Sequence, residues 1–274
     1  MLFILMSTYN GERYLAEQIE SIQAQTITEW RLFIRDDGST DGTRKIIDEY
    51  AANDARITIL RDKDNIGACR SFERLLTQCG DADYYAFADQ DDVWRPDKLD
   101  ICLSTIQATE KLYPNRPIVV HTDLQVVDEQ LQEIAPSFWR YSNIQPDLLD
   151  GHIRYLAICN SVTGCAMLFN RQAKMCSLPF SANAYMHDAW VALMSLYNGG
   201  LVIPNRQTPI RYRQHKGNVL GAVEYSTFGR SIAQRRYEAN VSYGRAKGYV
   251  FRNGIHFLVW KTIYFINRVL RKIV

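Results

Sequence analysis

The chain has 274 residues, of which 47% are hydrophobic and 23% charged, and its formal net charge is +2. This length is sufficient for a full hydrophobic core, and the composition is ordinary for a globular protein. The six cysteines show no CxxC or metal-type spacing, so we expect reduced thiols, as in a cytoplasmic protein, and no disulfide framework. The apolar run at residues 2–6 lacks a basic flank and a cleavage site and is too short to span a membrane, so we expect a buried strand there.

The small net charge conceals an uneven distribution along the chain. From Arg206 to the C-terminus there are 14 basic and 2 acidic residues, whereas the first 205 residues carry 18 basic and 28 acidic ones. A basic tail on an acidic body suggests that the tail faces an anionic partner, either nucleic acid or an acidic membrane surface.

The first 121 residues alternate between strand and helix patterns. Strand-like runs cover residues 2–6, 30–35, 57–60, 84–88 and 118–121, and apolar residues recur at helical spacing near residues 15–22, 46–50 and 72–76. Such alternation predicts an α/β fold with a mostly parallel sheet and helices on both faces. In open sheets of this kind, ligands bind outside the carboxyl ends of the strands.

Polar and glycine-rich segments follow four of the predicted strands. They read STYNG at 7–11, DDGSTDGT at 36–43, DNIG at 64–67 with Arg70 one turn later, and DQDD at 89–92. Each segment alone could be a turn or a helix cap. Four of them on one edge of one sheet indicate a nucleotide-binding site.

Three carboxylates crowd into the segment that follows the fourth strand: Asp89, Asp91 and Asp92. Like charges this close repel, so the cluster favours a bound cation. Mg²⁺ and Mn²⁺ bind through one or two carboxylates and keep positions open for substrate phosphates. The alternative is an acidic turn that caps a helix beginning at Pro96, a role that fits Asp92 in particular.

The second half of the chain has a different pattern. Residues 122–150, with Pro136 and Pro146, predict a loop-rich excursion over the site. A strand is predicted at 161–170, a helix at 188–197, and further strands at 201–203 and 210–212.

These motifs together resemble inverting family-2 glycosyltransferases of the GT-A fold. The later segments VTGCAMLFNR (162–171), HDAWVALMS (187–195) and YRQHKGNVLG (212–221) are similar to the bacterial rhamnosyltransferase-like branch of surface-polysaccharide and O-antigen synthesis. The resemblance implies a GT-A domain at 1–221, with a nucleotide-binding half at 1–121 and an acceptor and catalytic-base half at 122–221. A basic, amphipathic helical extension at 222–274 would follow it.

The resemblance also implies roles for individual residues. It places the catalytic base at Asp188, where the family usually has Glu-Asp and this chain has His187 before the aspartate. The implied metal ligands for Mn²⁺ or Mg²⁺ are Asp89, Asp91 and His215. The implied donor-binding residues are Thr8, Tyr9, Asn10, Asp36, Asp37, Asn65, Gly67, Arg70, Asp89, Gln90 and Arg213. The QxxRW motif of processive synthases is absent, which favours a single transfer per encounter.

By resemblance, the first expectation for the donor is dTDP-L-rhamnose, while UDP-hexoses and UDP-N-acetylhexosamines remain open. The acceptor would be a glycan, and we expect one carried by a lipid. Asp188 opens a helix beside an apolar face, where partial burial would raise its pKa; the alternative is that it caps that helix.

Residues 255–274 predict an amphipathic helix with interfacial aromatic residues and several lysines and arginines. This profile is typical of a helix that lies in the headgroup plane of an anionic inner leaflet without spanning it. We therefore expect a cytoplasmic protein attached peripherally to the membrane. The alternative is that the helix packs on the protein itself or on a second subunit.

Functions of other classes fit the sequence less well. A nucleotidyltransferase would need a GxGxR-type loop after the first strand, and an aspartate-nucleophile phosphatase would have its DxD there. A non-catalytic nucleotide-sugar or glycan-binding module would not need Asp188. Nucleic-acid binding by the basic tail would leave the strand-edge motifs unexplained, so no nucleic-acid partner is expected.

Overall fold

The computed structural model describes residues 1–62, 64–218, 221–222 and 248–270. Within them, a central sheet has the strand order β10-β6-β9-β4-β1-β2-β3. Its strands are β1 (Leu2–Thr8), β2 (Trp30–Asp36), β3 (Ile57–Leu60), β4 (Tyr84–Ala88), β6 (Ile118–Thr122), β9 (Met167–Asn170) and β10 (Leu201–Asn205). β9 runs antiparallel to both of its neighbours, and the other described pairs in this sheet are parallel.

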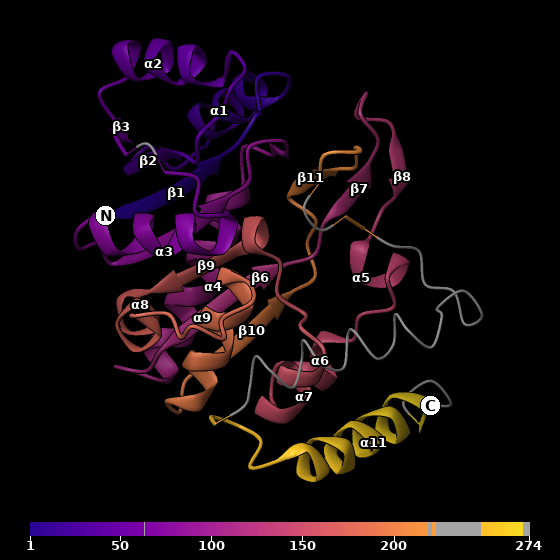
Figure 1. Cartoon of the computed structure of the whole chain (residues 1–274). Helices are drawn as coiled ribbons and strands as arrows, with labels where there is room; N and C mark the ends of the chain where they lie inside the picture. Colours follow the sequence, from indigo (N-terminus) through magenta and orange to yellow (C-terminus); the bar gives the residue numbers. More distant parts are fainter. Residues whose placement is uncertain (63, 219–220, 223–247, 271–274) are drawn as a thin grey trace.

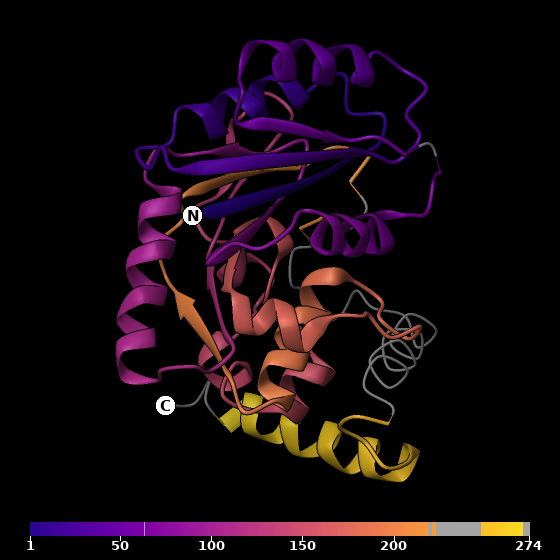
Figure 2. The same ribbon diagram turned by 90° about the vertical axis from the view of Figure 1, so that its left-hand side faces the viewer.

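Helices cover both faces of this sheet, as the alternating pattern predicts (Figures 1 and 2). Phe3 and Leu5 of β1 pack into one core with α3 (Ala68–Gln78), α8 (Arg171–Ser177) and α9 (His187–Tyr197). Ile4 and Met6 point to the opposite face and pack into a second core with α1 (Leu15–Gln23), α2 (Thr43–Asn53) and α4 (Lys98–Leu112). This alternation along one buried strand is the expected period of two. The predicted α/β fold is confirmed.

The segment predicted as one strand at 161–170 is divided. A 3₁₀ turn occupies Gly164–Ala166, and β9 begins only at Met167. The apolar composition that predicts a strand also suits this buried turn, so composition could not distinguish them. The turn places residues 163–165 at the end of the sheet that carries the polar segments.

The predicted excursion at 122–150 contains short regular elements. A small sheet has the order β5-β11-β7-β8, built from β5 (Val93–Trp94), β7 (Gln125–Val127), β8 (Glu133–Ala135) and β11 (Ile210–Arg213). It is followed by the short helices α5 (Phe138–Tyr141), α6 (Pro146–Leu149) and α7 (Ile153–Ile158). The strands β5, β7 and β8 have only two or three residues, which is too short to show a period of two, so the sequence did not predict them.

The predicted tail helix is present as α11 (Gly254–Leu270). It lies beside α6 and α7, at the opposite end of the molecule from α2 and β3, in both views (Figures 1 and 2). Residues 271–274 of the predicted helix, and 223–247 of the predicted extension, lie outside the described residues. Among the described helices, none combines the length and apolarity that a membrane crossing requires.

Candidate active site

The polar segments after β1, β2 and β4 meet at one edge of the sheet. β1 lies between the other two, and Thr8 pairs with Asp36 while Met6 pairs with Ala88. The residues that follow these three strands therefore emerge side by side, around a cavity of about 390 Å³ that we call the strand-edge cavity. A volume of this order suits a small-molecule ligand.

Nine of the fourteen residues singled out by the sequence line this cavity. They are Thr8, Tyr9, Asp37, Asn65, Gly67, Asp89, Gln90, Asp91 and Asp188. The other five, Asn10, Asp36, Arg70, Arg213 and His215, are not among its described lining residues, and each has protein partners in the surrounding loops.

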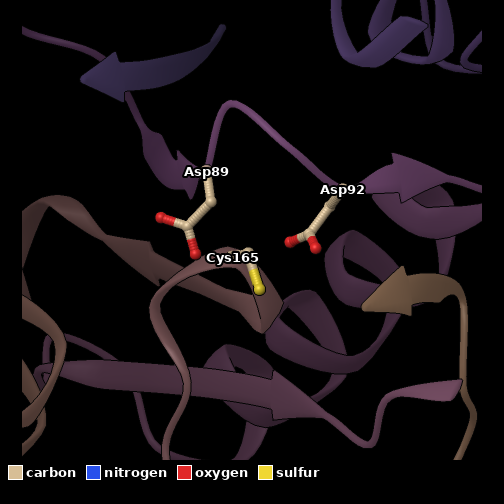
Figure 3. A group of neighbouring side chains, drawn as sticks. All are labelled: Asp89, Asp92 and Cys165. Carbon is tan, nitrogen blue, oxygen red and sulfur yellow. The ribbon is translucent and has the colours of Figure 1, made fainter. Parts of the chain in front are cut away.

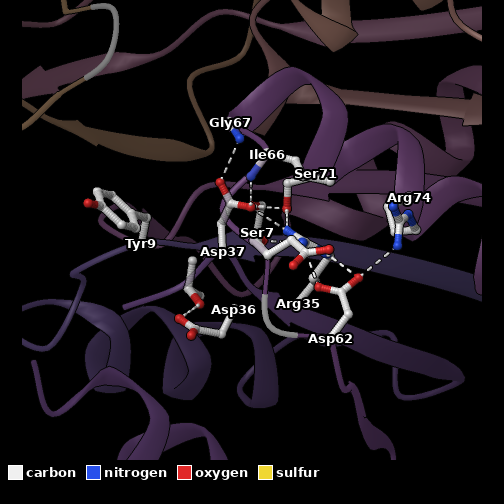
Figure 4. Close-up of polar contacts among 12 residues, drawn as sticks. Ser7, Tyr9, Arg35, Asp36, Asp37, Asp62, Ile66, Gly67, Ser71 and Arg74 are labelled. Carbon is white, nitrogen blue, oxygen red and sulfur yellow. Dashed lines mark hydrogen bonds and ion pairs between the residues drawn. The ribbon is translucent and has the colours of Figure 1, made fainter. Parts of the chain in front are cut away.

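Asp37 is held by a buried network that the sequence did not predict (Figure 4). The guanidinium of Arg35, which is fully buried, donates to Asp37 at 2.6 Å and also pairs with Asp62. The backbone N–H groups of Ile66 and Gly67 donate to the same Asp37 carboxylate at 2.9 and 2.8 Å. Because a carboxylate offers about four acceptor positions, these three bonds leave room for a ligand donor.

Asp36 and Asn10 shape the turn between β2 and α2. Asp36 accepts from Ser39 N at 3.0 Å and from Arg44 Nε at 2.6 Å. Burial acts to raise the pKa of Asp36, but the hydrogen bonds from Ser39 and Arg44 outweigh it and hold that pKa below its usual value. Asn10 Oδ1 accepts from Thr40 N at 2.9 Å. Both residues thus fix loop structure behind the cavity wall.

Gln90 connects the loop after β4 to the loop after β1. Its amide accepts from Tyr9 N and donates to Tyr9 O, both at 2.9 Å. A Cβ on Gly11 would lie 2.2 Å from Gln90 Oε1, so this close approach requires glycine at position 11. The Tyr9 ring remains 50% exposed at the cavity edge, where it can stack on a planar ligand.

The acidic segment after β4 folds so that Asp89 and Asp92 face Cys165 (Figure 3). One ligand atom from each of the three residues lies within 4.8 Å of the other two. Burial, followed by the charges of Asp91 and Asp188, raises the pKa of Asp89 to about 7. Burial and the same carboxylate cluster raise the pKa of Asp92 well above its ordinary value. Several carboxylates thus lie where each opposes ionisation of the others.

Asp91 faces the last predicted ligand, His215. The distance from His215 Nε2 to Asp91 Oδ2 is 2.7 Å, and Gly217 N donates to His215 Nδ1 at 3.1 Å. Because Nδ1 accepts, the imidazole proton lies on Nε2 and donates to Asp91. Asn218, which the sequence did not single out, accepts from His215 N at 2.6 Å and approaches Asp91 Oδ2 at 3.4 Å.

These residues fit a divalent cation. Asp91 Oδ2 and His215 Nε2 lie 2.7 Å apart, and a cation bound to both atoms would replace the proton that they share. Burial, followed by the charges of Asp91 and Asp188, raises the pKa of Asp89, and a cation would offset the repulsion among these carboxylates. Carboxylate oxygens suit Mg²⁺ and Mn²⁺, and an imidazole nitrogen is a common metal ligand.

Arg213 holds this acidic segment in place through hydrogen bonds to Asp91 and Asp92. Its Nε donates to the backbone oxygen of Asp91 at 2.8 Å, its backbone N–H donates to Asp92 at 3.1 Å, and its guanidinium also pairs with Glu17. Only 2% of Arg213 is exposed. Its cationic donors therefore position the acidic loop. Arg70 similarly bonds Glu73 at 2.6 Å and the backbone oxygen of Ser181 at 2.9 Å, which ties α3 to the loop before α9.

Asp188 lies in the first turn of α9 and lines the strand-edge cavity. The cap position of that helix is Met186, so Asp188 is not its N-cap. It is 8% exposed, and its Oδ1 accepts from Ala189 N at 2.6 Å. A carboxylate in the first turn of a helix is stabilised by the helix dipole.

His187 is a cavity residue whose role the sequence did not suggest. Its ring stacks on Phe72 with centroids 3.8 Å apart and meets Phe87 edge to face at 4.7 Å. Within the described part of the chain, neither ring nitrogen has a hydrogen-bond partner, although only 2% of the residue is exposed. Burial lowers the pKa of His187 to about 3, so the ring is neutral at physiological pH.

Gly164 allows His187 to take this position. A Cβ on Gly164 would lie 2.6 Å from His187 Nε2, which real Cβ atoms do not approach, and 3.7 Å from Asp188 Cβ. We predict that Gly164→Ala displaces His187 and lowers turnover at this site by about 10- to 100-fold, since small misplacements in a reacting geometry are costly. Gly151→Ala, where a Cβ meets nothing within 4 Å, is the matched control. Equal turnover by both variants would show that the close contact between Gly164 and His187 does not affect turnover.

A second cavity adjoins the strand-edge cavity at Asp188. We call it the Tyr185 cavity; it measures about 210 Å³ and shares Thr163, Met186, Asp188 and Tyr212 with the strand-edge cavity. Its further lining residues are Phe138, Ile144, Asn160, Ser161, Val162, Tyr185, Ala189 and Gly221. Asp188 thus stands at the junction of two ligand-sized spaces.

Known proteins resemble this chain in sequence and in structure. The dTDP-rhamnosyl transferase RfbG of Shigella flexneri is 40% identical over 98 residues, which cover 34% of either chain. The UDP-Glc:alpha-D-GlcNAc-diphosphoundecaprenol beta-1,3-glucosyltransferase WfgD of Escherichia coli is 33% identical over 104 residues, covering 38% of this chain and 40% of that one. The matches thus span little more than a third of these curated relatives.

Among solved structures, Staphylococcus aureus TarS 1–349 in complex with UDP-GlcNAc superposes with a TM-score of 0.62. The alignment covers 97% of this chain and 72% of that one at 15% sequence identity, which establishes a shared fold and confirms the predicted GT-A architecture. The family model described as glycosyl transferase family 2 matches residues 3–172, well over half of the chain. The chain belongs to glycosyl transferase family 2.

Proposed function

We propose that the protein is a metal-dependent, inverting glycosyltransferase that moves one sugar from a nucleoside diphosphate donor to a glycan during bacterial surface-polysaccharide synthesis. The observation that carries this proposal is the position of Asp188 between two cavities, with the Asp89–Asp91 segment and His215 beside the larger one. Family membership supports the reaction class.

The strand-edge cavity would hold the donor. Tyr9, Asp37 and Asn65 line this cavity and would contact the base and ribose, and Asp37 retains acceptor capacity for a base N–H. Asp89, Asp91 and His215 would hold Mn²⁺ or Mg²⁺, which as a Lewis acid would stabilise charge on the leaving diphosphate. The structurally similar PcManGT of Pyrobaculum calidifontis was solved with GDP-Man and Mn²⁺, at 16% identity and a TM-score of 0.55.

Asp188 would act as the base. An acceptor hydroxyl in the Tyr185 cavity would reach the Asp188 carboxylate, which lines that cavity as well as the strand-edge cavity. Inversion requires that this hydroxyl attack the sugar from the face opposite the leaving diphosphate. The carboxylate removes the hydroxyl proton while the acceptor oxygen bonds to the sugar carbon and the diphosphate departs. A positioned base of this kind contributes about 10²- to 10⁴-fold to the rate.

The identity of the donor is a narrower proposal. The likeness to the dTDP-rhamnosyl transferase RfbG favours dTDP-L-rhamnose, whereas the TarS complex with UDP-GlcNAc favours a UDP-sugar as the second candidate. Turnover of a panel of dTDP- and UDP-sugars with Mn²⁺ or Mg²⁺, on membranes bearing lipid-linked glycans, would decide between them. Binding of nucleotide-sugar with no turnover of any donor on any acceptor would favour the non-catalytic binding module instead.

We also infer a lipid-linked acceptor and therefore a peripheral position at the cytoplasmic membrane. The name of the relative WfgD includes a diphosphoundecaprenol-linked acceptor. Residues 255–274 combine basic and apolar side chains, which is the composition expected of a segment that contacts a membrane surface.

His187 would bond a hydroxyl of the bound sugar, because its buried ring nitrogens otherwise lack partners among the described residues. We predict that His187→Phe, which keeps the aromatic packing, leaves the affinity for UDP or dTDP unchanged and lowers nucleotide-sugar turnover by about tenfold. Isothermal titration with the nucleotide and steady-state turnover with the sugar donor separate the two effects. Unchanged turnover would assign His187 to core packing alone.

A further inference from the structure

Helix α11 has two apolar faces, of which one is used within the protein. Tyr264, which is 3% exposed, packs with Leu148, Leu149 and Tyr155. Asn267 Nδ2 donates to the hydroxyl of Tyr155 at 2.5 Å, and Arg268 donates to the backbone oxygen of Asn143 at 2.7 Å. This face of α11 therefore packs on the protein itself, which was the alternative to membrane contact that the sequence left open.

The opposite face is apolar and exposed. We call it the α11 stripe; it comprises Ile255 (75% exposed), Leu258 (60%), Val259 (51%), Phe265 (48%), Ile266 (54%), Val269 (57%) and Leu270 (55%). At 3.6 residues per turn these seven side chains fall within about 140° of the helix circumference, and Tyr264 lies roughly opposite them. A continuous apolar strip of this kind on a globular protein marks an interaction site.

The charge around the stripe identifies the partner. Residues 248–274 contain five lysines or arginines and no aspartate or glutamate. Of these, Lys261 lies on α11 and Arg252 is exposed just before it, whereas Arg268 of α11 is bonded to Asn143 on the face that packs on the protein. An apolar strip within a segment that carries basic and no acidic residues is complementary to an anionic lipid surface. Another protein copy would bring equal cationic charge to the same place.

Three cavities with shared lining residues include Leu270 of the stripe at one end of the series and Asp188 at the other. Leu270, the last residue of the stripe, lines a cavity of about 750 Å³ between α11 and α7, which includes Asp147. Asp147 also lines a cavity of about 490 Å³ beside Arg140, and Ile144 is common to that cavity and the Tyr185 cavity. Asp188, the proposed base, lines the Tyr185 cavity in turn.

We propose that the α11 stripe lies in the surface of an anionic bilayer and that the adjoining cavities admit the head of a lipid-linked acceptor from that surface to Asp188. The admission of a lipid-linked acceptor rests on the proposed function, whereas the contact between the α11 stripe and the bilayer does not. In both views α11 lies at one end of the molecule, with α1 and α2 of the nucleotide half at the other (Figures 1 and 2). A bilayer at α11 would therefore leave the strand-edge cavity open to a water-soluble donor.

Flotation of the full chain with vesicles of phosphatidylglycerol and phosphatidylcholine tests the surface. We expect the wild type to bind these vesicles, more weakly at high salt, and to bind pure phosphatidylcholine less. The double variant Leu258→Asp, Ile266→Asp should lower binding by at least about tenfold, because it places two charges at the lipid boundary. The matched control, Leu112→Asp with Met175→Asp, alters two exposed apolar residues (75% and 69% exposed) on α4 and α8 and should bind like wild type.

Three outcomes would overturn the inference: no vesicle binding by the wild type, equal loss in both double variants, or a wild-type dimer in sedimentation that the stripe variant dissociates. The last would assign the stripe to a second copy of the chain. UDP and dTDP titrations on the same variants keep the two proposals separate. If the wild type bound vesicles but bound neither UDP nor dTDP, the proposed function would be contradicted, whereas the membrane contact of the α11 stripe would still be supported.

Discussion

Replacing Asp91 by asparagine is expected to reduce sugar transfer by about 10³-fold and to abolish the response of nucleotide binding to Mn²⁺. Asp91 is the carboxylate that faces His215, and a Lewis acid held there contributes several kcal/mol to stabilisation of the leaving group. Asparagine keeps the shape of the side chain and an oxygen that can accept from His215 Nε2, so the fold should be retained. The measurement is steady-state turnover over a Mn²⁺ titration.

Asp100→Asn is the control for this variant, because Asp100 is an exposed carboxylate in the first turn of α4. It should leave both turnover and Mn²⁺ dependence unchanged. If Asp91→Asn kept wild-type turnover with the same Mn²⁺ requirement, the metal site would have to be placed elsewhere, with Asp89, Asp92 and Cys165 as the nearest remaining cluster.

The second large effect is expected for Asp188→Asn, which should lower kcat by about 10²- to 10⁴-fold. The amide cannot remove a proton, but its oxygen can still accept from Ala189 N as Asp188 Oδ1 does. Affinity for UDP or dTDP with Mn²⁺ should stay within about threefold of wild type, since the base acts on the acceptor. Turnover and calorimetric binding on the same preparation distinguish this pattern from that of Asp91→Asn.

A variant at Asp188 that lost nucleotide binding along with turnover would instead indicate a structural role at the start of α9. Turnover close to wild type would move the base to another carboxylate. The partly buried Asp89, whose pKa is raised to about 7 by burial and by the charges of Asp91 and Asp188, is the alternative within the same cavity.

The sequence predicted those features that depend on local pattern. The strands ending at Thr8, Asp36 and Ala88 show clear hydrophobic runs, and the parallel βαβ rule brings their ends to one edge. The amphipathic character of α11 was equally local. From the sequence, contact with a membrane and packing on the protein were alternatives for this helix. In the structure, one face of the helix packs on α7 and the other is exposed.

Contacts between distant segments could not be read from the sequence. Arg35 looked like the end of a strand, and only the fold shows that it is buried against Asp37 and Asp62. Asn218 approaches Asp91 across 127 positions of the chain, and Gly164 touches His187 because a turn replaces the predicted strand. A positional motif assigns a residue type to a site, but it does not reveal which side chains are already bonded to the protein, as those of Arg213 and Arg70 are.

Nucleotide binding to the strand-edge cavity is the central claim, and calorimetric titration of UDP and dTDP into the wild-type chain, with and without Mn²⁺, tests it most directly. We expect one nucleotide to bind at a single site, with an affinity that rises at least about tenfold on addition of Mn²⁺ in the wild type and does not rise in Asp91→Asn. No binding of either nucleotide at any Mn²⁺ concentration, together with tight binding of RNA or DNA, would contradict the account.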